Sequence, residues 1–185
     1  LDRPGLEAQL ADALPILNID HHLGNEHYSQ VNWVDTAAPS LGEMIHRLAR
    51  TLNLQIDSDT ATALYLTLVT DTGNFRFANA SARAFSAAAE LVQEGAQPTE
   101  VARWLYESQP PSAVRLLGET LQTLELDADG RVATVLLTGE MSERAGAQPG
   151  DSEGLIDVPR SIAGVEAVAV VRELEPGRCK GSLRS

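Results

Sequence analysis

The chain has 185 residues, of which 43% are hydrophobic, and a formal net charge of -12 from 14 Lys and Arg against 26 Asp and Glu. This length allows one large domain or two modest ones, and no apolar run approaches the ~20 residues of a membrane span. The negative charge excludes a general duplex-binding surface, because such a surface neutralises many phosphates with Lys and Arg.

The amino-terminal part of the chain predicts a helix followed by two strands. The helix is expected over residues 6–14, and Pro15 ends it. The run from Pro15 to Ile19 has the length and Ile content of a strand that is buried on both faces, as in a parallel sheet covered by helices. Residues 28–34 are rich in strand-forming side chains and predict the second strand.

The next part predicts helices. They are expected over residues 39–52, 58–71, 81–95 and 98–108. In the first of these, Leu41, Ile45, Leu48 and Leu52 share one face, which leaves His46 on the polar side. Gly95 closes the third helix in the usual way.

The pattern changes after a helix that starts at Pro111 and runs to Leu124. Strands are expected over residues 131–138, 165–174 and 178–184, with turns at residues 127–130 and 175–177. We therefore predict an α/β protein with a parallel-sheet domain over residues 1–110, a connecting helix over 111–125 and a smaller mixed α/β domain over 126–185.

Three residues with metal-binding chemistry follow the first predicted strand. Asp20, His21 and His22 stand where the strand meets its loop, and open α/β sheets place their ligand crevices there. An isolated triplet of this kind is also compatible with a solvated turn. Asp71 ends an apolar helix and, taken alone, is a helix cap as readily as a ligand. Together, these oxygen and nitrogen donors suit manganese or magnesium better than a metal that prefers thiolates.

Five sequence blocks in order resemble the DHH phosphoesterase family. The resemblance is to its branch of short-oligonucleotide nucleases that also dephosphorylate 3'-phosphoadenosine 5'-phosphate. The blocks are NIDHH (18–22), NWVDTAAPSLGEMI (32–45), TDTGNFRFANAS (70–81), EGLIDVPRSIAGVEAVAV (153–170) and KGSLRS (180–185). DHH alone is a weak match, whereas five blocks in sequence are a strong one.

The resemblance implies roles for the residues of the first and third blocks. His21 matches a metal ligand, and Asp71 matches an aspartate that bridges two manganese ions. His22 matches a residue that faces the substrate phosphate. Asp20 matches a group that orients the site through hydrogen bonds. Magnesium is the alternative metal.

The resemblance also implies a substrate-binding role for the last block. Arg184 matches a contact to the phosphate of the nucleotide, and Ser182 and Ser185 would flank it with hydroxyl donors. These residues lie in a locally basic segment, because residues 172–185 contain four basic and two acidic side chains. The expected partners are short single-stranded oligonucleotides or a nucleoside bisphosphate.

Three motifs of the family have no counterpart in the sequence. A histidine followed by two aspartates should precede Leu1, a further metal-bridging aspartate should stand just before it, and a GGGH loop should follow the last block. We therefore expect both domains to be partial and the chain to be a piece of a longer protein. As given, it holds only two of the expected metal ligands.

The function expected from this resemblance is hydrolysis of short oligonucleotides, of 3'-phosphoadenosine 5'-phosphate or of both, with two metal ions activating water. Two alternatives stay open: an inorganic pyrophosphatase or exopolyphosphatase of the same family, and a nucleotide-binding module without turnover. The single cysteine, Cys179, cannot form an internal disulfide, which fits a cytoplasmic protein. We expect no membrane contact and allow for a homodimer.

Overall fold

The structure, a computed structural model, describes residues 15–175 and 177–184. The predicted helix over residues 6–14 and the candidate Ser185 lie outside the described residues. The chain divides into two compact units, Leu1–Leu105 and Tyr106–Ser185. In the described part of the chain, we find no helix with the length and apolarity that crossing a membrane requires.

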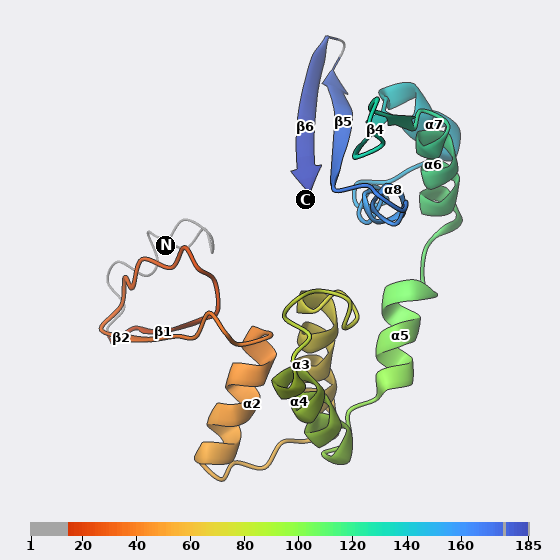
Figure 1. The fold of residues 1–185 in the computed structure, drawn as a ribbon. Helices are drawn as coiled ribbons and strands as arrows, with labels where there is room; N and C mark the ends of the chain where they lie inside the picture. The colour runs from red at the N-terminus through yellow and green to blue at the C-terminus, as the bar shows by residue number, and fades with distance from the viewer. Residues whose placement is uncertain (1–14, 176, 185) are drawn as a thin grey trace. The chain divides into compact units, whose positions relative to one another are not determined.

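The first unit combines a pair of strands with a group of helices (Figure 1). Its elements are β1 (Leu17–Asp20), β2 (Val31–Val34), α2 (Leu41–Thr51), α3 (Ser58–Asp71), α4 (Ala82–Gln93) and α5 (Pro98–Tyr106). The two strands are parallel, and their register pairs Leu17 with Val31 and Asp20 with Val34. Both strands therefore end at the same edge, directly before the segments that carry polar residues.

The burial of β1 differs from the prediction. Asn18 is buried, but Leu17 is 55% exposed and its partner Val31 is 56% exposed. The expectation of a strand buried on both faces is therefore wrong for Leu17. The sheet of this unit has two strands in the described residues.

The helix α2 packs on α3 through a different face from the one that the apolar pattern predicts. Its buried residues are Gly42, Glu43, Met44 and His46, whereas Leu41 and Leu52 are exposed. Gly42 permits the close approach, because a Cβ there would lie 2.7 Å from the carbonyl oxygen of Leu64.

His46 is 3% exposed, so its expected place on the polar side of the helix is wrong. Its Nε2 atom lies 3.0 Å from Oε2 of Glu94 on the loop after α4. A buried polar side chain is tolerated when it has such a partner. The apolar periodicity of α2 does not reveal this partner, which lies 48 residues away.

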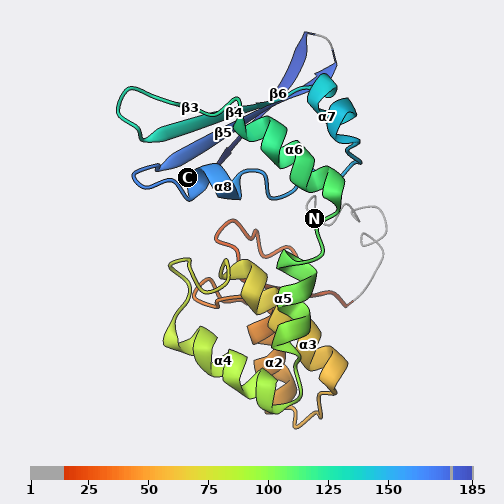
Figure 2. The ribbon, with the colours of Figure 1, turned by 90° about the vertical axis from the view of Figure 1, so that its right-hand side faces the viewer.

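The second unit is a mixed sheet with helices on one side (Figure 2). Its elements are α6 (Pro111–Leu121), β3 (Glu125–Leu126), β4 (Val132–Leu137), α7 (Gly139–Ala145), α8 (Asp157–Arg160), β5 (Ala167–Glu175) and β6 (Arg178–Arg184). The strand order is β3-β4-β5-β6. The pair β4–β5 is parallel, and the pairs β3–β4 and β5–β6 are antiparallel.

The core of the second unit follows the two-residue period of β4. Ala133, Val135 and Leu137 are buried, and Leu137 packs in one cluster with Leu116 of α6 and Leu155 of the segment before α8. Figure 2 shows α6 and α8 on the same side of the sheet. The edge strand β6 has exposed side chains throughout.

The α/β class predicted from the sequence is confirmed, while some boundaries differ. The helix that starts at Pro111 ends at Leu121, and Glu125–Leu126 form a short strand. The short helix α7 was not predicted. Its signals are local: the Thr138 hydroxyl accepts a hydrogen bond from the Met141 amide at 3.3 Å, and Gly146 ends it with a φ of 65°.

Candidate active site

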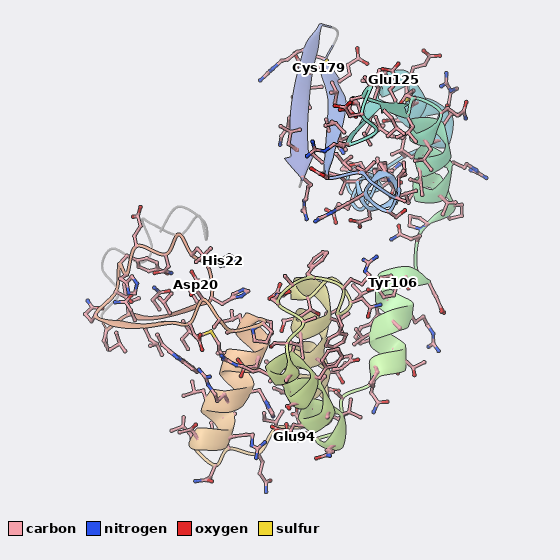
Figure 3. The ribbon with its side chains drawn as sticks, viewed as in Figure 1. Asp20, His22, Glu94, Tyr106, Glu125 and Cys179 are labelled. Carbon is pink, nitrogen blue, oxygen red and sulfur yellow. The ribbon has the colours of Figure 1, made fainter. Side chains whose placement is uncertain are left out.

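Asp20 organises the turn that follows β1. Its Oδ1 atom accepts hydrogen bonds from the backbone amides of His21 at 2.7 Å and His22 at 3.1 Å, and lies 2.6 Å from Nδ1 of His22. Its Oδ2 atom accepts from the Asn25 side chain at 2.6 Å. Figure 3 shows Asp20 and His22 together at the end of this strand. The carboxylate therefore fixes both histidines relative to β1.

These contacts also set the charge of Asp20. Burial raises the pKa of its carboxyl group, but the hydrogen bonds from Asn25, His22 and the backbone amides lower it more strongly. The net pKa lies well below the usual range of an aspartate. Asp20 is thus a stable anion at neutral pH, able to hold the Nδ1 proton of His22.

Three asparagines support this turn. The buried Asn18 donates from Nδ2 to Oδ1 of Asn25 at 2.8 Å and to Oδ1 of Asn32 at 3.0 Å. Asn18 and Asn32 are register partners on β1 and β2. Asn25 lies in the loop after β1. The sequence signal for this network is the asparagine at the second position of each strand, Asn18 and Asn32.

His21 and Asp71 come together in the first unit, as the sequence led us to expect. His21 Nε2 lies 3.5 Å from Asp71 Oδ2, and the side chains are 17% and 35% exposed. Two donors at this separation fit one cation with metal–donor bonds of ~2.1 Å. No cluster of three or more His, Cys, Asp or Glu side chains able to hold a metal occurs among the described residues.

The turn after Asp71 is held in an unusual backbone conformation. Gly73, Asn74 and Phe75 have φ values of 56°, 57° and 59°, in the left-handed region that non-glycine residues seldom adopt. The fully buried Thr72 holds this turn, since its hydroxyl donates to the Leu68 carbonyl at 2.7 Å and accepts from the Phe75 amide at 3.1 Å. These two hydrogen bonds fix the path of the chain directly after Asp71, at the end of α3.

Asn79 ties that turn to the start of α2. Its Nδ2 donates to the carbonyl of Asp71 at 3.1 Å and to the carbonyl of Pro39 at 3.0 Å. Asn79 belongs to the block TDTGNFRFANAS, in which no local pattern marks it for this role. The contact joins residues 40 positions apart, which no local pattern reveals.

Arg83 forms a second link. Its Nε donates to Glu43 Oε1 at 2.8 Å, and its Nη2 donates to Asp35 Oδ2 at 2.9 Å. Asp35 follows β2, and its amide donates to the carbonyl of Asp20 at 3.0 Å. Burial raises the pKa of Asp35, but the hydrogen bonds from Arg83 and Arg47 lower it below the usual value. The strand ends that carry the histidines are thus anchored to α2 and α4.

Ser182 and Arg184 belong to the second unit. Both line a cavity of about 400 Å³, together with Arg172 and Lys180. Ser185 lies outside the described residues. The structure thus places the expected phosphate contacts in one hollow of that unit, separately from His21 and Asp71 in the first.

Comparison with known proteins gives relatives but no matching family model. The chain is 33% identical over 170 residues to the bifunctional oligoribonuclease and PAP phosphatase NrnA of Thermus thermophilus, covering 92% of this chain and 50% of the relative. It is 30% identical over 155 residues to the protein of the same name from Bacillus subtilis, covering 82% of this chain and 49% of the relative. The chain spans about half the length of these curated relatives.

A solved structure agrees with these relatives. The crystal structure of an exopolyphosphatase-related protein from Bacteroides fragilis matches with a TM-score of 0.86 and 28% identity. The match covers 96% of this chain and 54% of that protein. The fold of this chain therefore has a counterpart in an independently solved protein.

Proposed function

We propose that this chain, which belongs to the DHH-family phosphoesterases, is part of a metal-dependent phosphoesterase. The proposed substrates are short oligonucleotides and 3'-phosphoadenosine 5'-phosphate. The relatives are hydrolases named for these two substrates. Because the chain spans about half of their length, the activity and substrates of the whole protein are part of the proposal.

The observation that carries the proposal is the approach of His21 Nε2 to Asp71 Oδ2, at 3.5 Å. The two residues are 50 positions apart, and each stands at the end of an apolar element. An imidazole nitrogen and a carboxylate oxygen are suitable donors for manganese, and magnesium is the alternative. Divalent cations bound there supply Lewis acidity toward a phosphoryl oxygen and lower the pKa of bound water.

His22 and Asp20 have separate roles in this proposal. Since Asp20 Oδ1 lies 2.6 Å from His22 Nδ1, the proton of the imidazole sits on that nitrogen. The other ring nitrogen, Nε2, is left to meet the substrate, and the side chain is 52% exposed. When protonated, it donates a hydrogen bond to a phosphate oxygen. Asp20 acts through His22 by orienting and polarising the ring.

The test is hydrolysis by a protein of the relatives' full length that carries these residues. With manganese, it should convert 3'-phosphoadenosine 5'-phosphate to adenosine monophosphate and phosphate, and degrade a trinucleotide. Chelation of the metal should stop both reactions. The 185-residue chain, with its partial ligand set, should turn over little. Metal-independent hydrolysis of both substrates contradicts the proposal.

A second candidate is an exopolyphosphatase, because the matched solved structure is that of an exopolyphosphatase-related protein; a pyrophosphatase of the same family is the other form of this candidate. The two activities separate in one assay, because a polyphosphatase prefers tripolyphosphate or pyrophosphate to the nucleotide substrates. The third reading, a nucleotide-binding module without turnover, requires nucleotide binding and no manganese-dependent hydrolysis at full length.

A further inference from the structure

The second unit gathers cationic side chains in one cavity of an otherwise acidic chain. Arg172, Lys180 and Arg184 line the hollow of about 400 Å³, with the hydroxyl-bearing Ser152 and Ser182 beside them. Arg172 donates a hydrogen bond to Ser152. Within the described residues, none of the three cations has a carboxylate partner, although Arg131 and Arg144 of the same unit do. Their charge is therefore available to a ligand.

The strand register brings these cations together, and their mutual repulsion destabilises the folded sheet. On the antiparallel pair β5–β6, Arg172 stands opposite Lys180, and Arg184 stands opposite Val168. Lys180 and Arg184 share one face, because side chains alternate along a strand. Like charges directly opposite one another destabilise a sheet. A bound anion would offset this repulsion.

The spacing along β6 suggests the length of that anion. Lys180 and Arg184 are four positions apart, which corresponds to about 13 Å at ~3.3 Å per residue. The two phosphates of a single nucleoside bisphosphate are closer together than this. The backbone of an oligonucleotide of several units spans it.

The rest of the cavity wall favours a nucleotide chain over inorganic polyphosphate. Leu155, Ile156 and Val170 are the apolar side chains that line the same hollow on the face of the cations. Sugars and bases have apolar faces that such a surface can contact, whereas polyphosphate has none. The mixture of apolar wall and spaced cations matches a single-stranded nucleic acid.

We propose that Arg172 and Lys180 form a second phosphate subsite on the β5–β6 face, which selects substrates by length. Arg184 holds one phosphate, and the Arg172–Lys180 pair holds a phosphate further along a short single-stranded oligonucleotide. The proposal rests on the proposed function for the class of substrate and adds residues that discriminate oligonucleotides from the bisphosphate.

The experiment measures binding to the 185-residue chain by fluorescence polarisation, with labelled oligoribonucleotides of two to five nucleotides in the presence of a metal chelator. Lys180→Gln and Arg172→Gln should each weaken binding of the pentanucleotide about tenfold, as expected for a charge-assisted contact. The loss should become smaller as the oligonucleotide becomes shorter, and should be smallest for 3'-phosphoadenosine 5'-phosphate. Each variant should also reduce the salt dependence, by a slope of about 0.7 per lost phosphate contact.

Arg131→Gln is the matched control. It removes the same charge from the same unit, but from an exposed arginine that is paired with Glu166 outside the cavity. It should bind every ligand as the wild type does. Wild-type circular dichroism and a melting temperature no lower than that of the wild type, in all variants, exclude loss of fold as the cause.

The proposal is overturned if the loss is the same at every length, if Arg131→Gln weakens binding equally, or if tripolyphosphate competes as well as the pentanucleotide. Because binding is measured without metal, it does not depend on turnover. Length-dependent binding with no hydrolysis at full length overturns the proposed function and leaves this subsite. If the full-length protein hydrolyses both substrates but the Lys180→Gln and Arg172→Gln variants lose no oligonucleotide binding in a length-dependent way, only the subsite is overturned.

Discussion

At the scale of single residues, the site depends on which atoms the backbone brings together. The sequence placed Asp20, His21, His22 and Asp71 at the ends of elements, and the structure brings His21 and Asp71 within 3.5 Å. The sequence did not reveal the roles of Asn18, Asn25 and Arg83, because these residues act through side-chain contacts with other segments of the chain. Metal-binding residue types are recognisable in a sequence, whereas the polar groups that orient them look like ordinary polar residues.

Removing either candidate metal donor should stop catalysis without unfolding the protein. In a protein of the relatives' full length, we expect His21→Ala and Asp71→Asn each to lower kcat by more than the ~10–100-fold typical of groups that only orient a ligand. Steady-state kinetics in manganese buffer measures this, with melting curves as the check on folding. Rates near wild type for both variants contradict the metal-ligand assignment.

A lysine at position 184 should bind substrate phosphate less well although it keeps the charge. Arginine presents a planar fork with paired donors, which lysine cannot reproduce. In the full-length protein, Arg184→Lys should raise KM for 3'-phosphoadenosine 5'-phosphate and leave the manganese dependence unchanged. The assignment fails if Arg184→Ala changes neither KM nor kcat.

The acid dependence of stability should include a contribution from Asp35. Its pKa is lowered in the folded state by Arg83 and Arg47, so the ionised form stabilises the fold at neutral pH. This contribution is present above the usual aspartate pKa of ~3.9 and is lost as the pH falls through the lower folded-state value. Asp35→Asn should therefore cost about 1 kcal/mol at pH 7 and progressively less below pH ~4.

Urea unfolding at a series of pH values checks this prediction. The side chain of Asp35 is 22% exposed, so the ion pair is only partly screened by solvent. A destabilisation that is constant from pH 7 to 3, or that grows on acidification, contradicts the role of the Arg83 contact.

At the scale of elements, period and capping patterns located most helices and strands. The strand over residues 178–184 has the predicted bounds, since turn residues and alternation fix them together. The face of α2 was misjudged, because a glycine contact and two partnered polar residues bury the side that hydrophobicity leaves out. The short elements α7 and α8 have too few residues to show a period.

Gly42 should be essential to the packing of α2 on α3. A Cβ at this position would stand 2.7 Å from the carbonyl oxygen of Leu64 and also overlap the Thr67 side chain. Since backbone must move, Gly42→Ala should destabilise the protein by about 1–3 kcal/mol. Chemical denaturation measures the change in the free energy of unfolding.

Gly118 provides the control for this substitution. It lies in α6, and a Cβ there would have no neighbour within 4 Å. Gly118→Ala should stabilise by roughly 0.5–1 kcal/mol, because alanine is the better helix former. Equal effects of the two substitutions would show that the α2–α3 contact is not close.

At the scale of the whole molecule, two units divide the proposed chemistry. The first holds the candidate metal donors, and the second holds the cationic cavity. The α/β class and the order of elements were recognisable from the sequence. The cavity was not, because it is formed by strand pairing and by the segment before α8.

The most direct test of the metal site is a manganese titration of the 185-residue chain followed by nuclear magnetic resonance. Bound Mn²⁺ broadens the signals of nearby backbone amides, so it reports where the ion sits even when binding is weak. We predict that the amides of residues 20–22 and 71–73 broaden first and together, and that His21→Ala removes both effects. Broadening that begins instead in acidic surface turns such as residues 127–130, or that persists unchanged in His21→Ala, would contradict a metal site at His21 and Asp71.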